Sequence, residues 1–194
     1  MRHPLEFLPV HLRRPFFYTF LFLTLILFSI FRVLDQPLRT EAAPNGIVSF
    51  ELAGTPLAAR AILDSWKQLS LLLSSTREPS PDIVNVAYAY AAFGLGLDYL
   101  FMPVYSLALA FGTLLAAGKH VGRVKMLAVV AGYGAFAAAL FDAVENYALF
   151  RVLLGESQSS DPAIAAFCAI VKFGLLAFGI LVCLIGWLAP RKAD

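Results

Sequence analysis

The chain has 194 residues, of which 60% are hydrophobic and 14% are charged, and its formal net charge at pH 7 is +2. A soluble globular domain is about 45–50% apolar and about 25% charged. This composition therefore excludes an ordinary soluble fold and indicates a membrane protein. The small net charge gives no reason to expect a nucleic-acid partner.

Four stretches of the sequence are long and apolar enough to cross a bilayer, which takes about 20 residues of helix. They cover about 16–34, 86–117, 124–150 and 162–189. We therefore expect an all-α fold, an integral membrane four-helix bundle that forms a single membrane domain over 1–194. We interpret the first stretch as an uncleaved anchor rather than a signal peptide, because no small-x-small cleavage site follows it; the nearest candidate, at 41–43, begins with a glutamate.

The basic residues predict the orientation of these spans, because cytoplasmic loops are enriched in lysine and arginine. They gather at the N-terminus, between the second and third spans, and at the C-terminus: Arg2, Arg13, Arg14, Lys119, Arg123, Lys125, Arg191 and Lys192. We expect a multi-pass protein of a bacterial inner membrane, with both termini cytoplasmic and an outer loop of about 35–85 on the extracytoplasmic side.

The outer loop is predicted to contain one strand and one amphipathic helix. Residues 47–52, IVSFEL, alternate as a strand does, and such a strand would pack over the helices or pair with another chain. The Thr-Pro pair at 55–56 is typical of a helix start. The apolar face of this helix carries Ile62, Trp66, Leu69 and Leu73. We expect the helix to lie on the membrane surface or over the mouth of the bundle, with Glu51 and Trp66 covering the polar residues within the spans.

Ionisable residues interrupt the second, third and fourth spans, although each such charge costs about 2.5–3.5 kcal/mol to insert into lipid. At a rise of about 1.5 Å per residue, Asp98, Asp142 and Lys172 fall at a similar depth. Small residues share the helix faces of these side chains, so we expect them to point into the bundle. The predicted ligand or ion-pair cluster consists of Asp98, Tyr105, Asp142, Glu145, Asn146 and Lys172.

Three uses of this cluster stay open at the level of sequence. Lys172 can pair with Asp98 or Asp142 and lock the helices together, with Asn146 bonding across helices. Three carboxylates against one lysine, however, leave at least one carboxylate that must be protonated, hydrated or matched by a ligand cation. The cluster would then line a cavity that reaches the outer face, or it would pass protons or ions.

The sequence predicts no catalytic residue, no metal site and no cofactor. The histidines, His3, His11 and His120, lie outside the spans, and no cysteine–histidine set has zinc spacing. Cys168 and Cys183 share one predicted helix at a separation of about 22 Å, which is too far for a disulfide.

Several segments together resemble a family of bacterial four-span integral membrane proteins whose activity is uncharacterised. They are GIVSFELAGT and ILDSW in the outer loop, LGLDYLF at Asp98, LFDAVENYAL, and VKF at Lys172. The resemblance covers about 37–181 and implies the four-span fold without an activity. A fainter similarity in architecture, supported only by Asp98, Asp142 and Glu145, is to sterol-isomerase and sigma-2-receptor type four-helix membrane proteins, which bind amine or sterol ligands in a bundle cavity. Likeness of fold does not fix function.

Our working hypothesis is an inner-membrane protein whose carboxylate and lysine cluster lines a pocket for a small lipophilic or cationic ligand, surrounded by membrane lipids. The alternative is a non-catalytic accessory or assembly subunit of a larger membrane complex. An isomerase-like enzyme comes third.

Overall fold

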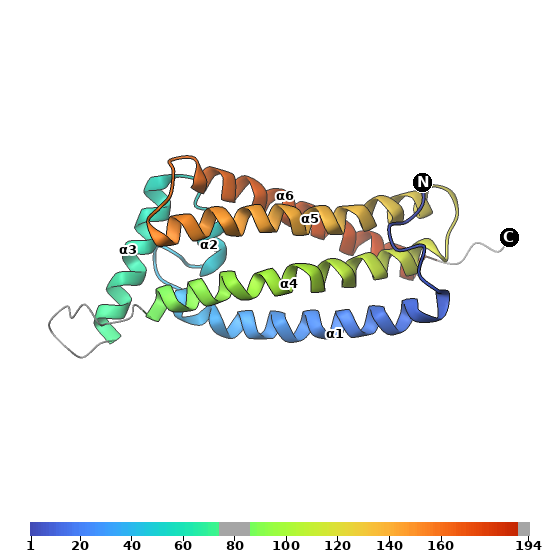
Figure 1. The fold of residues 1–194 in the computed structure, drawn as a ribbon, viewed down its shortest axis with the longest axis horizontal. Coiled ribbons are helices and arrows are strands. Elements are labelled where there is room, and N and C mark those ends of the chain that lie inside the picture. Colours follow the sequence, from blue (N-terminus) through green and yellow to red (C-terminus); the bar gives the residue numbers. More distant parts are fainter. Residues whose placement is uncertain (74–85, 190–194) are drawn as a thin grey trace. The chain divides into compact units, whose positions relative to one another are not determined.

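The structure, a computed structural model, describes residues 1–73 and 86–189, with side chains placed up to residue 68 in the first range. The described part of the chain is helical and contains no β-strand. Its elements are α1 (Val10–Leu34), the 3-10 helix η1 (Gln36–Leu38), α2 (Ile47–Glu51), α3 (Pro56–Leu73), α4 (Val86–Ala117), α5 (Gly122–Leu154) and α6 (Asp161–Leu188) (Figure 1).

Four of these helices, α1, α4, α5 and α6, are long and apolar enough to cross a membrane, as the sequence predicted. The bounds of α4 match the prediction, whereas α5 extends it at both ends. α1 begins at Val10, whereas the prediction began at about residue 16. The prediction started late because the hydropathy pattern left Arg13 and Arg14, in the first turns of the helix, outside the span. Long basic side chains at the end of a span reach the aqueous interface, so these charges are compatible with a membrane helix.

The chain divides into two compact units, and each long helix contributes residues to both. The terminal unit holds both chain ends and consists of Met1–Leu27, Leu100–Asp142 and Val171–Asp194. The loop unit consists of Phe28–Tyr99 and Ala143–Ile170.

Small residues let the helices of the terminal unit approach closely. Ala116, Ala128 and Ala131 are fully buried in one apolar cluster with Val182. A methyl group added at Gly186 of α6 would lie 2.5 Å from the Ala116 side chain of α4, which is too close for any real contact. Without a hydrophobic force between helices in lipid, such close van der Waals contact is a main source of helix association.

The residues that precede α1 fold back onto the terminal unit. The His3 imidazole is 4% exposed, and its Nε2 lies 3.1 Å from the Thr113 hydroxyl of α4. The Leu5 amide donates to His3 Nδ1 at 3.2 Å, so Nε2 is the nitrogen that carries the proton and donates to Thr113. A side chain at Gly132 of α5 would overlap the imidazole, so a glycine is required there. His3 therefore lies outside the spans in sequence but is packed against two of them.

The predicted strand at 47–52 is wrong, because this segment forms the short helix α2. Gly46 precedes the helix at φ 59°, a conformation that favours glycine. The Asp35 carboxylate accepts a hydrogen bond from the Ile47 amide at 2.7 Å, which satisfies one of the unpaired donors at the start of α2. The alternating pattern misled because periodicity alone does not distinguish a strand from a helix in so short a segment.

α3 packs its apolar face into the core of the loop unit. Ile62 is 4% exposed and Trp66 is fully buried, whereas Arg60, Asp64 and Lys67 are exposed. The Trp66 indole donates to the carbonyl of Leu38 at 2.8 Å. The side chains of Leu69 and Leu73, predicted on the same face, lie outside the described residues. The helix itself is present as predicted, and the side of the membrane on which it lies stays a prediction.

Candidate functional site: polar residues of the spans and a cavity under α3

A charged triad joins three helices within the terminal unit. The Lys172 ammonium of α6 lies 2.9 Å from Asp142 Oδ1 of α5, and the Tyr105 hydroxyl of α4 donates to Asp142 Oδ2 at 2.8 Å. All three residues are 6% exposed or less. The sequence predicted a pair between Lys172 and either Asp98 or Asp142, and the structure places Lys172 on Asp142. Both oxygens of the Asp142 carboxylate thus have a donor.

The Lys172 ammonium also lies over an aromatic face. Its Nζ is 4.8 Å from the ring centroid of Phe173, within the range of a cation–π interaction. Lys172 therefore meets both a carboxylate and a π face in a buried setting, and these two contacts offset part of the cost of removing its charge from water.

The other predicted polar residues belong to the loop unit. The Asn146 amide donates to Asp98 Oδ2 at 2.9 Å and to the Leu95 carbonyl at 3.2 Å, so α5 is bonded to α4. Asn146 and Glu145 are fully buried, whereas Asp98 is half-buried. Because both acceptors face the amide nitrogen, the orientation of the Asn146 side chain is fixed. This is the bond across helices that the sequence suggested for Asn146.

The two residues predicted as an outer cover, Glu51 and Trp66, are both buried in the loop unit, Glu51 at 8% exposure on α2. The Trp66 ring packs against Phe50, with centroids 5.3 Å apart, and against Tyr88 of α4 at 6.4 Å. Trp66 is therefore part of the apolar core between α3 and α4. That Glu51 and Trp66 cover the polar residues within the spans stays a prediction.

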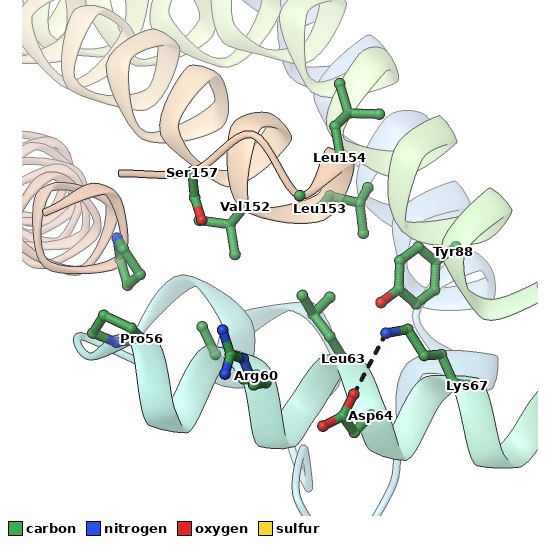
Figure 2. A pocket seen from close by; sticks show the side chains of 13 residues that line it. Pro56, Arg60, Leu63, Asp64, Lys67, Tyr88, Val152, Leu153, Leu154 and Ser157 are labelled. Carbon is green, nitrogen blue, oxygen red and sulfur yellow. Dashed lines mark hydrogen bonds and ion pairs between the residues drawn. The ribbon is translucent and has the colours of Figure 1, made fainter. Parts of the chain in front are cut away.

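A cavity of about 540 Å³ lies in the loop unit between α3, the end of α5 and the start of α4. Figure 2 shows Arg60, Leu63 and Lys67 of α3 pointing toward the end of α5 and toward Tyr88 of α4. Val152 and Leu153 form the opposite wall. The sequence predicted a cavity beside Asp98, Asp142 and Glu145, and none of these three lines this one.

Apolar and polar side chains line this cavity in about equal measure, and its α3 edge carries cations. The exposed Lys67 ammonium lies 3.5 Å from the Asp64 carboxylate and 6.0 Å from the centroid of the Tyr88 ring. Arg60 adds a second cation, so Arg60, Asp64 and Lys67 together carry one net positive charge. The cavity is therefore suited to a molecule with an apolar body and an anionic group.

Sequence reasoning missed this cavity because it depends on how α3 packs against the end of α5. The only local signal was the polar edge of α3, where Arg60, Asp64 and Lys67 follow one another at spacings of four and three. Such a pattern alone is typical of a solvated helix face.

Within residues 1–73 and 86–189, no group of three or more histidine, cysteine, aspartate or glutamate side chains is arranged to hold a metal ion. Comparisons with known protein families, with curated proteins and with solved structures found no match to the chain. The family resemblance and the bacterial origin therefore stay predictions.

Proposed function

We propose that this multi-pass membrane protein binds a small lipophilic molecule with an anionic group in the cavity under α3. The observation that carries the proposal is the cavity itself, since about 540 Å³ falls within the 300–1,000 Å³ typical of small-molecule sites. Leu63, Val152 and Leu153 would hold the apolar body of the ligand. The Arg60 guanidinium would bind its anionic group, because guanidinium is well matched to carboxylate and phosphate.

This proposal keeps the lipophilic ligand of the sequence analysis but moves it away from the carboxylates. A carboxylate that already accepts from an ammonium and a phenol, as Asp142 does, offers little to a ligand cation. We assign the Lys172, Asp142 and Tyr105 triad to holding α4, α5 and α6 together, and the Asn146 bonds to holding α4 and α5.

The second candidate is the non-catalytic accessory or assembly subunit. The same triad favours it, because polar groups that bond one another within the spans are what a purely structural subunit needs. A larger complex that co-purifies with the chain in mild detergent, together with an empty cavity, would favour this candidate. We propose a bacterial inner membrane with cytoplasmic termini for either function, on the basis of the basic loops.

Fluorescence tests the ligand proposal, using a dansyl-labelled C11 fatty acid as the probe. The chain has two tryptophans, and in a Trp187→Phe background the remaining Trp66 ring lies 6.4 Å from that of Tyr88, which lines the cavity. Energy transfer from Trp66 to bound dansyl would report binding. We expect saturable transfer that weakens about tenfold in Arg60→Ala, corresponding to about 1.4 kcal/mol.

Two variants make this test specific. Leu63→Phe narrows the cavity without changing charge and should also weaken the transfer. Arg32→Ala removes an exposed cation of α1 that does not line the cavity, and it should leave the transfer unchanged. If neither Arg60→Ala nor Leu63→Phe differs from the background protein, the probe is partitioning into detergent and the proposed site is wrong.

A further inference from the structure

A second cavity, of about 520 Å³, lies in the terminal unit where the first turns of α1 meet the ends of α4 and α6. Three cations line it, Arg13, Arg14 and Lys119, and none of the described residues that line it is acidic. Two aromatic side chains, Tyr18 and Trp187, complete its rim. The cavity is independent of the one under α3 and shares no residue with it.

We infer that this second cavity binds the phosphate group of an anionic phospholipid, with the acyl chains directed along α1. Three positive charges, with no acidic side chain among the described lining residues, favour an anion. Basic pockets between membrane helices are suited to lipid headgroups. Tryptophan and tyrosine are enriched at the level of the headgroups, which is where the ends of three spans would place Tyr18 and Trp187.

Two of the three cations, Arg13 and Lys119, are positioned by other contacts of the chain. The Arg13 guanidinium donates to the carbonyls of Glu6 at 2.8 Å and Leu8 at 3.0 Å. These bonds use two of its five N–H donors and fix the guanidinium plane, which leaves the other donors for a phosphate oxygen. The Lys119 ammonium lies 5.4 Å from the Trp187 ring centroid, a cation–π distance that holds it at the rim.

A lipid explains the surroundings of the cavity better than a soluble phosphate does. Leu114 and Leu115 supply apolar lining beside the cations. An apolar stripe runs along α1 from Tyr18 through Phe22 to Leu25, at spacings of four and three residues. These three side chains are 60%, 64% and 55% exposed, respectively. This stripe is a continuous track for an acyl chain, whereas a soluble anion would make no use of it.

Native mass spectrometry of the full chain tests the proposal, in mixed micelles of phosphatidylglycerol and phosphatidylcholine. We expect phosphatidylglycerol to be retained preferentially by the wild type, and its retention to fall at least tenfold in Arg14→Gln/Lys119→Gln. The matched control is Arg123→Gln/Lys125→Gln, which removes two exposed cations of α5 that do not line the cavity. The control should bind as the wild type does. Equal loss in both variants, or no loss in either, would overturn the site.

Two further arms keep the test decisive. Trp66 is fully buried and Trp187 is 41% exposed, so phosphatidylglycerol with brominated acyl chains should quench mainly Trp187 in the unmodified protein. Brominated phosphatidylcholine should quench it several-fold less, and equal quenching would refute headgroup selection even if the double variant fails to fold. Addition of millimolar inorganic phosphate should leave the bound lipid in place; displacement would assign the cavity to a soluble anion and overturn the lipid.

Discussion

The Lys172 ammonium lies 2.9 Å from Asp142 Oδ1, and the two side chains are only 6% and 3% exposed. The pair joins α6 to α5 at a point where neither charge can reach water. The attraction within such a pair is offset by the cost of desolvating both ions, so its presence is weak evidence for stability. Replacing only one partner of the pair has a larger effect on stability, because the remaining charge is left buried without its partner.

Lys172→Met should therefore destabilise the protein strongly. Breaking a buried pair from one side costs about 3–5 kcal/mol, and methionine keeps most of the side-chain volume. Thermal melting in detergent measures the effect. Lys125→Met, at an exposed position of α5, is the control and should change stability by about 0.5 kcal/mol or less.

The double variant Lys172→Met/Asp142→Asn separates the charge from the packing. It removes both charges, so it should recover much of the stability that Lys172→Met loses. A double variant as unstable as the single one would mean that Asp142 does not carry the uncompensated charge, and the assignment of the triad as a lock would fail.

Asn146→Ala should loosen α5 from α4 within the loop unit. The variant removes the donor to Asp98 Oδ2 and to the Leu95 carbonyl. A hydrogen bond to a charged group contributes about 1.5–3 kcal/mol, and we expect a loss in that range by chemical or thermal unfolding. Val144→Ala, two residues away and 49% exposed, loses no such bond and should cost clearly less. Equal losses would indicate that helix propensity or volume, and not the amide, decides the effect.

The two tryptophans should respond differently to the same substitution. Trp66→Phe removes the bond from the indole to the Leu38 carbonyl in a fully buried setting, so we expect a loss of about 1–3 kcal/mol. Trp187→Phe changes a ring that is 41% exposed and should cost less. Differential scanning fluorimetry with an external dye compares them, and a larger loss for Trp187→Phe would contradict the burial of Trp66.

The sequence predicted the parts of this fold that depend on local patterns. Hydropathy located the four spans, because length and apolarity are properties of each segment alone. Helical rise brought Asp142 and Lys172 to one depth, and the cost of a lone charge in lipid then required a partner. Tyr105 was predicted as a member of the cluster without a named partner, and its hydroxyl donates to Asp142 on the neighbouring helix.

What the sequence could not predict depends on packing between segments. The Asp35 carboxylate accepts a hydrogen bond from the first amide of α2, twelve residues further along the chain. The alternation at 47–52 could therefore not reveal a helix. His3 precedes the first helix and has no periodic neighbours, so nothing marked it as buried. Both cavities lie where helices from different parts of the chain meet, and no single segment is enough to indicate either one.

The burial of His3 against α4 and α5 should make the stability of the protein depend on pH. Burial, the largest cause, lowers the pKa of His3 from 6.5 to about 4, nearby Glu6 raises it in part, and Arg13 lowers it further. In the unfolded chain the imidazole regains its ordinary pKa, so between pH 6.5 and about 4 the unfolded state binds more protons. The free energy of unfolding therefore keeps its full value above pH 6.5. It decreases as the pH falls toward 4, by an amount on the order of 3 kcal/mol.

Unfolding of the wild type and of His3→Gln at a series of pH values from 7.5 to 4 isolates this effect, because carboxylates elsewhere contribute equally to both proteins. Glutamine keeps an amide that can donate to the Thr113 hydroxyl, which accepts from Nε2 of the wild-type imidazole. The stability difference between the two proteins should shrink or reverse as the pH falls, since only the wild type must exclude a proton from a buried ring. A difference that stays constant across this range would show that His3 is exposed to solvent or charged in the folded protein, and the packing of the N-terminus over Gly132 would then be wrong.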